Sequence, residues 1–434
     1  RRGFASVCRS FPITPLEQIL MDTIRVVGPM SVAQYMGECL LHPQHGYYMG
    51  RDVFGRSGDF ITSPEISQVF GECVGVWVAS CWQRLGGPQH LDIVEMGPGR
   101  GTLAADVLRT LSQVQSFGQT ASSMDIHLVE ASPALRQLQC QKLCGVPYPS
   151  TGDCAPTVIP LRNGHRPMVR WHDSIVHLSS TPSSPTHEVG SGRGCIVLAH
   201  ELLDALPVHH FQYTGRGWRE LLVDINKGPG EHHLKFVLSG RPTMPSKFLE
   251  KILSEDHRRG KVPTVGTTVE VSMEVMSVAQ DIARVLQSRD VGCALLVDYG
   301  EDHLMPPTLQ GIREHKIVHP LSQPGLVDLS AYVDFSSVRA AVQSFNHQKA
   351  VTTVVHGPVT QQQFLFGTGI AQRLERLLIG CGDDKGRAED ILGQCQRLVD
   401  PEQMGHSYKC MALTHNMPGD DPPTGFEVHN LYSK

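Results

Sequence analysis

The sequence predicts an α/β fold with a mostly parallel sheet, and three observations carry this prediction. Short apolar runs alternate with segments of helical period along most of the 434 residues. In the stretch 91–111, an apolar strand, a glycine-rich turn and an amphipathic helix follow one another, as in nucleotide-binding α/β domains. Acidic residues also come directly after several apolar runs, at the sheet edge where such folds bind ligands.

Composition and charge narrow the class of protein. Hydrophobic residues make up 40% of the chain and charged residues 19%, as in a globular protein with a sizeable core. The net charge is −5 and the sequence has no block of basic residues, so it gives no sign of a positively charged surface that would bind nucleic acid. No apolar run reaches the length of about 18 residues that a membrane span needs. The twelve cysteines form no C-x-x-C pair, so we expect reduced, buried thiols and no metal site.

The N-terminal region is predicted to be helical. Residues 1–14 contain three arginines and no acid, a composition typical of the tail of a mitochondrial transit peptide or of a disordered basic terminus. A first helix is predicted over 16–27, before a Gly-Pro pair. Ser31 is placed to cap a second helix that runs to about residue 41.

A long loop rich in glycine, aromatic and turn residues follows at 42–62. Ser63, Pro64 and Glu65 then combine a capping hydroxyl, a proline and an acid, which predicts the start of a helix reaching to about Cys81. The loop before this helix is either a lid over a ligand site or a structural crossover, and the residues alone leave both open.

The glycine-rich turn after the strand 91–94 favours a particular ligand. A dinucleotide-binding turn would have its third glycine at position 102, where this chain has Thr102. Glu95 stands two residues before the first glycine, and a carboxylate there suits the cationic methionine end of S-adenosylmethionine better than a pyrophosphate. We therefore favour a methyltransferase-type site over a dinucleotide site or a purely structural turn. The turn residues assigned to this cofactor site are Gly97, Pro98, Gly99 and Gly101.

Two further strands end in acids. The run 125–130 reads as a strand ending in Glu130, which is placed to bind ribose hydroxyls, the alternative being a solvated strand-end charge. A third strand over 168–171 leads to His172 and Asp173, and we include Asp173 among the candidate cofactor-binding residues.

The strand 195–199 is followed directly by His200, Glu201 and Asp204. This pattern lacks the second histidine of the zinc-protease sequence H-E-x-x-H, and Pro207 leaves little room for the helix such a site needs. We expect Glu201 and Asp204 to orient a cationic substrate, although Asp204 is also a candidate cap for the next turn.

The remaining chain alternates strand and helix signals. Residues 211–238 read as an inserted β-hairpin, and helices are predicted over 275–286 and 361–379. Strands are predicted over 294–300 and 408–413, and Asp334 is placed to cap a helix from Phe335.

Taken together, the chain resembles the MidA-type family of S-adenosylmethionine-dependent methyltransferases. The motifs that carry the resemblance run in order from about residue 15 to 415: HPQHGYYM, FGRSGDFITSPEISQVFGE, VEMGPGRGTL, HLVEASP, LAHELLDALPVHHFQ, GWRE, LLVDYG, PGLVDLSAYVDF and GPVTQQQFL. The resemblance implies a Rossmann-like sheet of seven strands with S-adenosylmethionine as cofactor. It places the donor on Glu95, the three glycines and Glu130, with Gly58, Asp59, Ser63 and Pro64 closing over it.

The mitochondrial branch of this family implies a function. It implies symmetric dimethylation of an arginine in a core subunit of the peripheral arm of complex I, needed for assembly of the complex in the mitochondrial matrix. The implied domain order is a terminal segment at 1–14, N-terminal helices and lid loop at 15–86, a methyltransferase core at 87–415 and a tail at 416–434. Within the core, 211–268 is a hairpin insertion and 340–405 a helical part.

A chemical role follows for the acids after the fourth strand. An arginine guanidinium keeps its proton because its pKa exceeds about 12, so it needs a carboxylate that holds two nitrogens and turns the third toward the methyl group. Glu201 is the expected carboxylate, with Asp204 as helper. Two alternatives stay open: an assembly chaperone that binds the donor without catalysis, and a methyltransferase for a small molecule.

Overall fold

The computed structural model describes residues 11–49, 62–114, 123–148, 157–158, 167–180, 192–253, 263–347 and 352–427. The chain forms two compact units, each assembled from separate segments of the sequence. Unit 1 comprises Arg1–Val53, Asp204–Val275 and His303–Asp334. Unit 2 comprises Phe54–Leu203, Met276–Asp302 and Phe335–Lys434. The division into consecutive domains that is expected from the sequence remains a proposal. The two structural units, in contrast, are discontinuous in the sequence.

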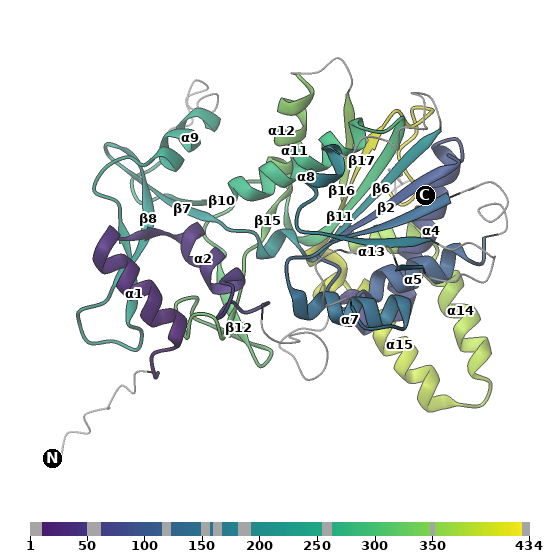
Figure 1. Ribbon diagram of the computed structural model, residues 1–434, viewed down its shortest axis with the longest axis horizontal. Coiled ribbons are helices and arrows are strands. Elements are labelled where there is room, and N and C mark those ends of the chain that lie inside the picture. Colours follow the sequence, from purple (N-terminus) through teal and green to yellow (C-terminus); the bar gives the residue numbers. More distant parts are fainter. Residues whose placement is uncertain are drawn as a thin grey trace. The chain divides into compact units, whose positions relative to one another are not determined.

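Unit 2 is built on a mostly parallel sheet, which confirms the predicted fold class (Figure 1). The expected number of seven strands is wrong, since the strand path among the described residues already has eight members. The strand order is β16-β17-β11-β6-β2-β3-β5-β4. Neighbours from β11 to β5 pair in parallel, whereas β17 pairs antiparallel with both β11 and β16. The strands are β2 (His90–Met96), β3 (Ser123–Val129), β4 (Thr157–Val158), β5 (Met168–His172), β6 (Arg193–His200), β11 (Val291–Glu301), β16 (Thr353–Thr360) and β17 (Tyr408–His415). The region 340–405, expected to be helical, therefore also supplies strand β16.

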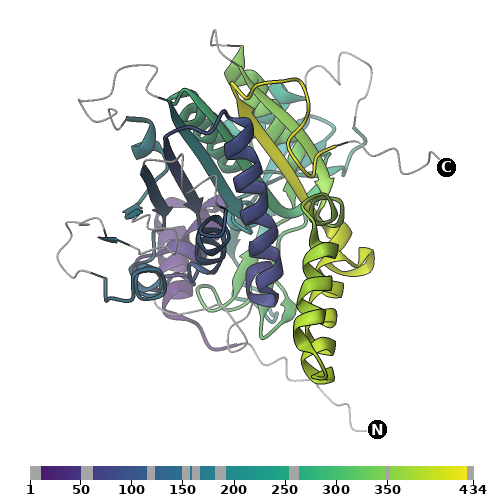
Figure 2. The ribbon, with the colours of Figure 1, turned by 90° about the vertical axis from the view of Figure 1, so that its right-hand side faces the viewer.

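Helices cover this sheet and close its core. They are α3 (Ser63–Ile66), α4 (Gln68–Arg84), α5 (Thr102–Leu111), α7 (Pro133–Cys144), α8 (Val176–Ser180), α11 (Met273–Gln287), α12 (Phe335–Asn346), α13 (Gln361–Gly367), α14 (Ile370–Cys381) and α15 (Lys385–Val399), with a π-turn at Pro401–Gly405. Figure 2 shows the long helix α4 beside the paired helices α14 and α15. Trp77 and Phe70 of α4 are fully buried in the core of the unit.

Close packing of α4 against α5 depends on two glycines one helical turn apart. A Cβ atom on Gly71 would lie 2.5 Å from the Asp106 side chain, and one on Gly75 would lie 2.6 Å from that of Thr110. The missing side chains therefore let the two helix backbones approach, and α5, which follows the glycine-rich turn, is fixed firmly to the core.

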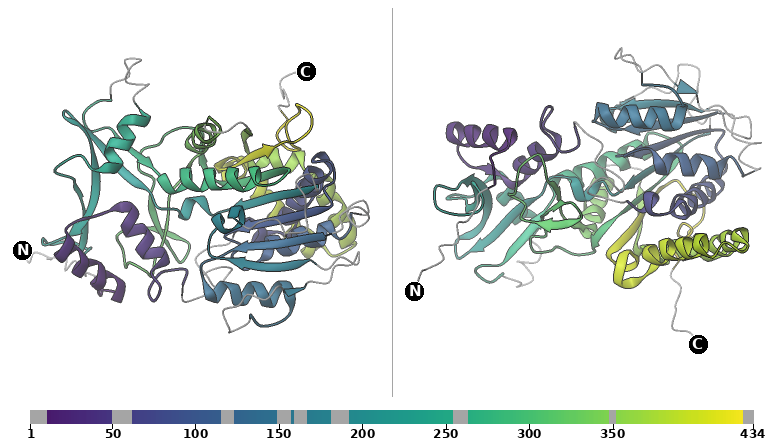
Figure 3. Two further views of the ribbon diagram at one scale, coloured as in Figure 1. Left: turned by 45° about the horizontal axis from the view of Figure 1, so that its top comes forward. Right: turned by 90° about the horizontal axis from the view of Figure 1, so that it is seen from below.

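Unit 1 has its own small sheets. In the first, the order is β1-β8-β7-β10, with β9 also paired to β8, and the second is β13-β12-β14. Helices α1 and α2 pack against β8 (Figures 1 and 3). The elements are α1 (Pro15–Val27), β1 (Met30–Ser31), α2 (Val32–Leu41), a 3₁₀ turn (Leu203–Ala205), β7 (His209–Thr214), β8 (Gly217–Ile225), β9 (Leu234–Leu238), α9 (Met244–Ile252), β10 (Thr268–Val271), β12 (Gln310–Arg313), β13 (Lys316–Val318), β14 (Asp328–Ser330) and β15 (Val333–Asp334).

Helix ends that depend on local chemistry match the sequence predictions. Ser31 forms a capping box with Gln34 at the start of α2, and α1 ends at Gly28. The hairpin material of 211–238 is confirmed as β7, β8 and β9.

Ten cysteines among the described residues are free thiols. No helix in that part of the chain is long and apolar enough to cross a membrane.

Two predicted helices are each broken in two. The helix expected from Ser63 to Cys81 stops after one turn, because Ser67 is extended (φ −151°) and caps α4 by accepting from the Val69 N–H. The predicted cap at Ser63 is also wrong, since Thr62 precedes the helix and Ser63 is its first residue. The helix expected over 361–379 is divided at Gly369, whose φ of 89° is left-handed and starts α14.

Candidate functional site

The glycine-rich turn follows β2 at the carboxyl edge of the parallel sheet. Gly97, Gly99 and Gly101 have φ values of 62°, 51° and 76°, so all three lie in the left-handed region that glycine adopts without strain. The Gly97 N–H donates to the Val129 carbonyl oxygen of the neighbouring strand at 3.0 Å. Gly101 is the N-cap of α5 and has no side chain to cap the helix, whereas the N–H of Ala104, the third helical residue, interacts with the Glu95 carboxylate.

Glu95 places a buried carboxylate beneath this turn. Burial raises the pKa of Glu95 to about 8, an effect that the Asp106 carboxylate adds to and that the backbone N–H of Ala104 only partly offsets. Its Oε2 atom is buried without a hydrogen-bond partner among the described residues. A carboxylate in this condition fits a cationic ligand group, because the added positive charge would stabilise its ionised form.

Glu130 follows β3 directly, as predicted. Its Oε1 accepts from the Ser132 N–H at 2.8 Å, and its Oε2 accepts from Nε2 of Gln139 at 3.1 Å. Burial raises the pKa of Glu130, although these hydrogen bonds oppose the shift. Gln139 was not anticipated from the sequence. It also donates to the Gly99 carbonyl oxygen at 2.8 Å, so one side chain joins the glycine-rich turn to Glu130.

Asp173 lies at the same edge of the sheet, after β5. The Glu130 N–H donates to the carbonyl oxygen of His172, the residue before Asp173, at 3.0 Å. The Asp173 carboxylate is 78% exposed and pairs with the Arg136 guanidinium. Arg136 Nε also donates to the Glu130 carbonyl oxygen at 2.8 Å. The structure therefore brings Asp173 and Glu130 together through one arginine.

Glu201 has an unusual backbone conformation. Its φ is 48°, in the left-handed region that residues with a side chain rarely adopt, and its N–H donates to the Val297 carbonyl oxygen at 2.9 Å. Strained residues of this kind cluster at functional sites. Oε1 of Glu201 accepts from the Ser63 N–H at 3.1 Å and from Ser63 Oγ at 3.4 Å. Nε2 of His200 lies 3.4 Å away from that oxygen, and burial lowers the pKa of His200 to about 3, so its ring is neutral.

A second residue that the sequence analysis did not assign to the site holds this turn. Asp298 on β11 is fully buried, and its Oδ2 accepts from the N–H groups of Leu202 at 3.1 Å and Leu203 at 2.8 Å. Leu202 in turn contacts the glycine-rich turn so closely that a Cβ on Gly97 would lie 2.8 Å from Leu202 Cδ1. The Glu201 turn and the glycine-rich turn are therefore packed together within unit 2.

The other predicted residues are placed differently. Asp204 belongs to unit 1, where its Oδ2 accepts from Ser330 Oγ at 2.8 Å. Ser63 and Pro64 are buried in the first turn of α3, near Glu201 through the Ser63 contacts. Gly58 and Asp59 lie outside the described residues.

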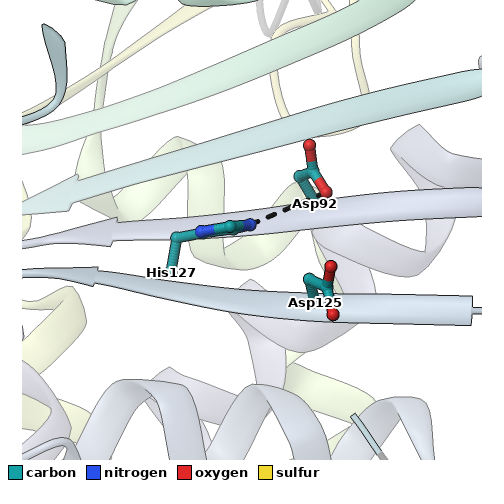
Figure 4. A group of neighbouring side chains, drawn as sticks. All are labelled: Asp92, Asp125 and His127. Atoms are coloured by element: carbon teal, nitrogen blue, oxygen red, sulfur yellow. Dashed lines mark ion pairs between the residues drawn. The ribbon is translucent and has the colours of Figure 1, made fainter. Parts of the chain in front are cut away.

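Three side chains on β2 and β3 have the spacing of a metal site. The ligand atoms of Asp92, Asp125 and His127 lie within 4.8 Å of one another (Figure 4). Asp92 is already paired, however, with Arg289 at 2.9 Å and Arg193 at 3.0 Å. Burial alone would raise the pKa of Asp92, but His127 and the two guanidinium groups hold it far below the usual range. These charges make the group a buried ion-pair network and a poor cation site.

The strand order, the glycine-rich turn after β2 and the acids after β3 and β6 define the fold class of the S-adenosylmethionine-dependent methyltransferases. Residues 73–353 match the family described as "S-adenosyl-L-methionine-dependent methyltransferase", and the chain belongs to this family. S-Adenosylmethionine is accordingly the methyl donor.

Curated relatives and a solved structure extend the comparison over nearly the whole chain. "Protein arginine methyltransferase NDUFAF7, mitochondrial" from Danio rerio is 40% identical over 406 residues, covering 91% of this chain and 85% of that protein. The human protein of the same name is 36% identical over 405 residues, covering 93% and 84%. A crystal structure from Burkholderia thailandensis with bound S-adenosyl-homocysteine has a TM-score of 0.71 at 24% identity, covering 97% of this chain and 98% of its own.

Proposed function

We propose that this methyltransferase acts on an arginine of a protein substrate in mitochondria. The names of relatives at 36–40% identity support the arginine, the protein substrate and the mitochondrial location. Symmetric dimethylation, a core subunit of the complex I peripheral arm as target, a need for the reaction in complex I assembly, and the matrix as the compartment are part of the same proposal. They rest on the motif resemblance described above.

The donor site of the proposal consists of the turn Gly97–Gly101 with Pro98, the acids Glu95 and Glu130, and Asp173. S-Adenosylmethionine supplies an electrophilic methyl group on a sulfonium when it is bound. The observation that favours this placement is the buried Oε2 of Glu95, which has no hydrogen-bond partner in the described part of the chain and suits the cationic methionine end. Glu130 retains acceptor capacity on its carboxylate for ribose hydroxyls. Ser63 and Pro64, in the first turn of α3, complete the proposed site. Gly58 and Asp59, which the resemblance places over the donor, belong to the same proposal and lie outside the described residues.

Glu201 is the residue that we assign to the acceptor arginine. The single observation that carries this assignment is its left-handed conformation on a turn that Asp298 fixes against Gly97. A carboxylate held beside the methyl donor can pair with two guanidinium nitrogens and turn the third toward the methyl group. The neutral, buried His200 next to it adds no positive charge that would compete with the guanidinium. Asp204 remains the proposed helper, although its carboxylate is engaged by Ser330.

The experiment that tests this function is a transfer assay with deuterated S-adenosylmethionine and isolated complex I subunits, read by mass spectrometry. The proposal expects label on an arginine of one peripheral-arm subunit. Label on a small molecule instead would favour the small-molecule methyltransferase. Complex I assembly that survives Gly99→Val, in cells whose extracts show no arginine transfer, would favour the chaperone.

A further inference from the structure

Gln139 is a buried, hydrogen-bonded polar side chain beside the glycine-rich turn. It lies on α7 with no solvent exposure, although glutamine is usually a surface residue. Its amide makes three hydrogen bonds, to the Gly99 carbonyl oxygen at 2.8 Å, to Glu130 Oε2 at 3.1 Å and from Trp171 Nε1 at 2.9 Å.

These partners fix which way the amide points. The Trp171 indole N–H can only donate, so it must face Oε1 of Gln139. The Gly99 carbonyl can only accept, so it must face the NH₂ group. That group has two hydrogens, and the second is directed to Glu130 Oε2. The amide orientation follows from its chemistry and leaves neither end of the side-chain amide unused.

We propose that Gln139 is a positioning residue of the donor site, which locks the glycine-rich turn and the ribose-binding acid into one preformed cradle. The inference rests on the proposed placement of the donor at Gly99 and Glu130. Methionine and adenosine are the two halves of the cofactor. Gln139 ties together the glycine-rich turn, assigned to the methionine half, and Glu130, assigned to the ribose of the adenosine half. Such prior fixing lowers the ordering cost of binding and raises affinity.

The substitution Gln139→Glu would test the hydrogen-bond pattern directly. The introduced carboxylate would stand against the Gly99 carbonyl oxygen and the Glu130 carboxylate, with no hydrogen to offer either. The nearby charges are those of Glu130, of Arg136, which donates to the Glu130 carbonyl oxygen, and of Lys142, which donates to Thr102. The two carboxylates would share one proton at low pH and repel each other once it is lost.

The experiment is calorimetric titration of the full chain with S-adenosylhomocysteine. Gln139→Met keeps the length of the side chain and removes the amide, and we expect it to weaken binding by about 10-fold or more, since two hydrogen bonds that hold the cradle are lost. Gln137→Met is the matched control, because Gln137 is an exposed glutamine on the same helix. We expect Gln139→Glu to bind at low pH and to lose affinity relative to wild type as the pH rises.

The variants distinguish an error in the placement of the donor site from an error in the role of Gln139. Gly99→Val and Glu130→Ala should abolish binding, and if they bind normally the donor-site placement itself is wrong. If they lose binding while Gln139→Met binds as well as the Gln137→Met control, the positioning role is overturned. A ratio of Gln139→Glu to wild-type affinity that stays constant with pH also overturns it, and this ratio needs no comparison of stabilities between variants.

Discussion

Oε1 of Glu201 accepts two hydrogen bonds from Ser63, one from the backbone N–H at 3.1 Å and one from Oγ at 3.4 Å. The two residues are 138 positions apart in the sequence. This contact links the first turn of α3, which follows the loop expected to close over the donor, to the carboxylate that we assign to arginine. It leads to the first prediction.

Glu201→Gln should abolish arginine methylation and leave the donor bound. A neutral amide cannot form the charged, two-point pair with the guanidinium, so we expect kcat to fall by about 10²-fold or more. Donor affinity, measured separately by titration with S-adenosylhomocysteine, should match wild type. Glu389→Gln, an exposed change of the same kind on α15, is the control. If Glu201→Gln retains wild-type turnover, the assignment of Glu201 to the acceptor arginine is wrong.

Asp298→Ala should loosen the turn that carries Glu201. It leaves the N–H groups of Leu202 and Leu203 without their carboxylate acceptor, and each buried unsatisfied group costs about 1–3 kcal/mol. Chemical denaturation should therefore show a loss of several kcal/mol, with Asp298→Asn less affected because its amide oxygen can still accept. A stability equal to wild type for Asp298→Ala would contradict this role.

Gly97→Ala should be destabilising beyond the cost of its backbone conformation. A non-glycine residue in the left-handed region costs about 1 kcal/mol, and the new Cβ would also lie 2.8 Å from Leu202 Cδ1. Gly86→Ala is the matched control, since Gly86 has a φ of 86° but open space around it. We expect the Gly97 variant to lose about 2 kcal/mol more than the Gly86 variant in denaturant unfolding. Equal losses would show that Leu202 moves away freely.

Glu95 should make both stability and donor binding depend on pH. Its pKa is about 8 in the folded chain and near 4.5 when unfolded, so the native state holds the extra proton between these values. Its contribution to the free energy of unfolding is present in full below pH 4.5 and is lost as the pH rises through 8.

A cationic donor favours the ionised form of Glu95, so binding between these pH values should release a proton. Calorimetry in buffers of different ionisation enthalpy measures this release. It should disappear above pH 8 and in Glu95→Gln. Equal proton release in wild type and Glu95→Gln would show that another group titrates.

Chelators should leave donor binding and methyl transfer unchanged. The carboxylate of Asp92 is neutralised by Arg193 and Arg289, which leaves Asp92, Asp125 and His127 little net charge for a cation. The measurement is turnover before and after dialysis against a strong chelator, with and without added zinc. Activity that falls on chelation and returns with zinc would contradict this interpretation of the cluster.

Local chemistry was enough to predict much of the fold. The capping box formed by Ser31 and Gln34 can be recognised from the sequence alone. The apolar runs before Glu130 and Asp173 likewise place both acids directly after parallel strands. The break at Ser67 was missed because the apolar residues keep their helical spacing across it, and Ser67, as a cap, interrupts the helix. The contact of Ser63 with Glu201 could not be predicted either, because it joins distant parts of the chain.

The supporting residues of the site were hidden for a similar reason. In the sequence, Gln139 differs in no way from its exposed neighbour Gln137, and its role emerges only when α7 brings it against Gly99 and Trp171. Asp298 lies within the strand predicted over 294–300, but only the parallel pairing of β11 with β6 brings its carboxylate to the N–H groups of the Glu201 turn. Residues such as these, which support another site residue, leave no recognisable motif in the sequence around them.

The most direct test of the central claim combines the purified chain, deuterated S-adenosylmethionine and isolated peripheral-arm subunits of complex I. Mass spectrometry then locates the label and fragmentation distinguishes symmetric from asymmetric products. We predict two deuterated methyl groups placed symmetrically on one arginine with the wild-type chain, and a rate of labelling lower by about 10²-fold or more with Glu201→Gln. Absence of labelled arginine with a wild-type chain that binds the donor, or equal labelling by both chains, would contradict the account.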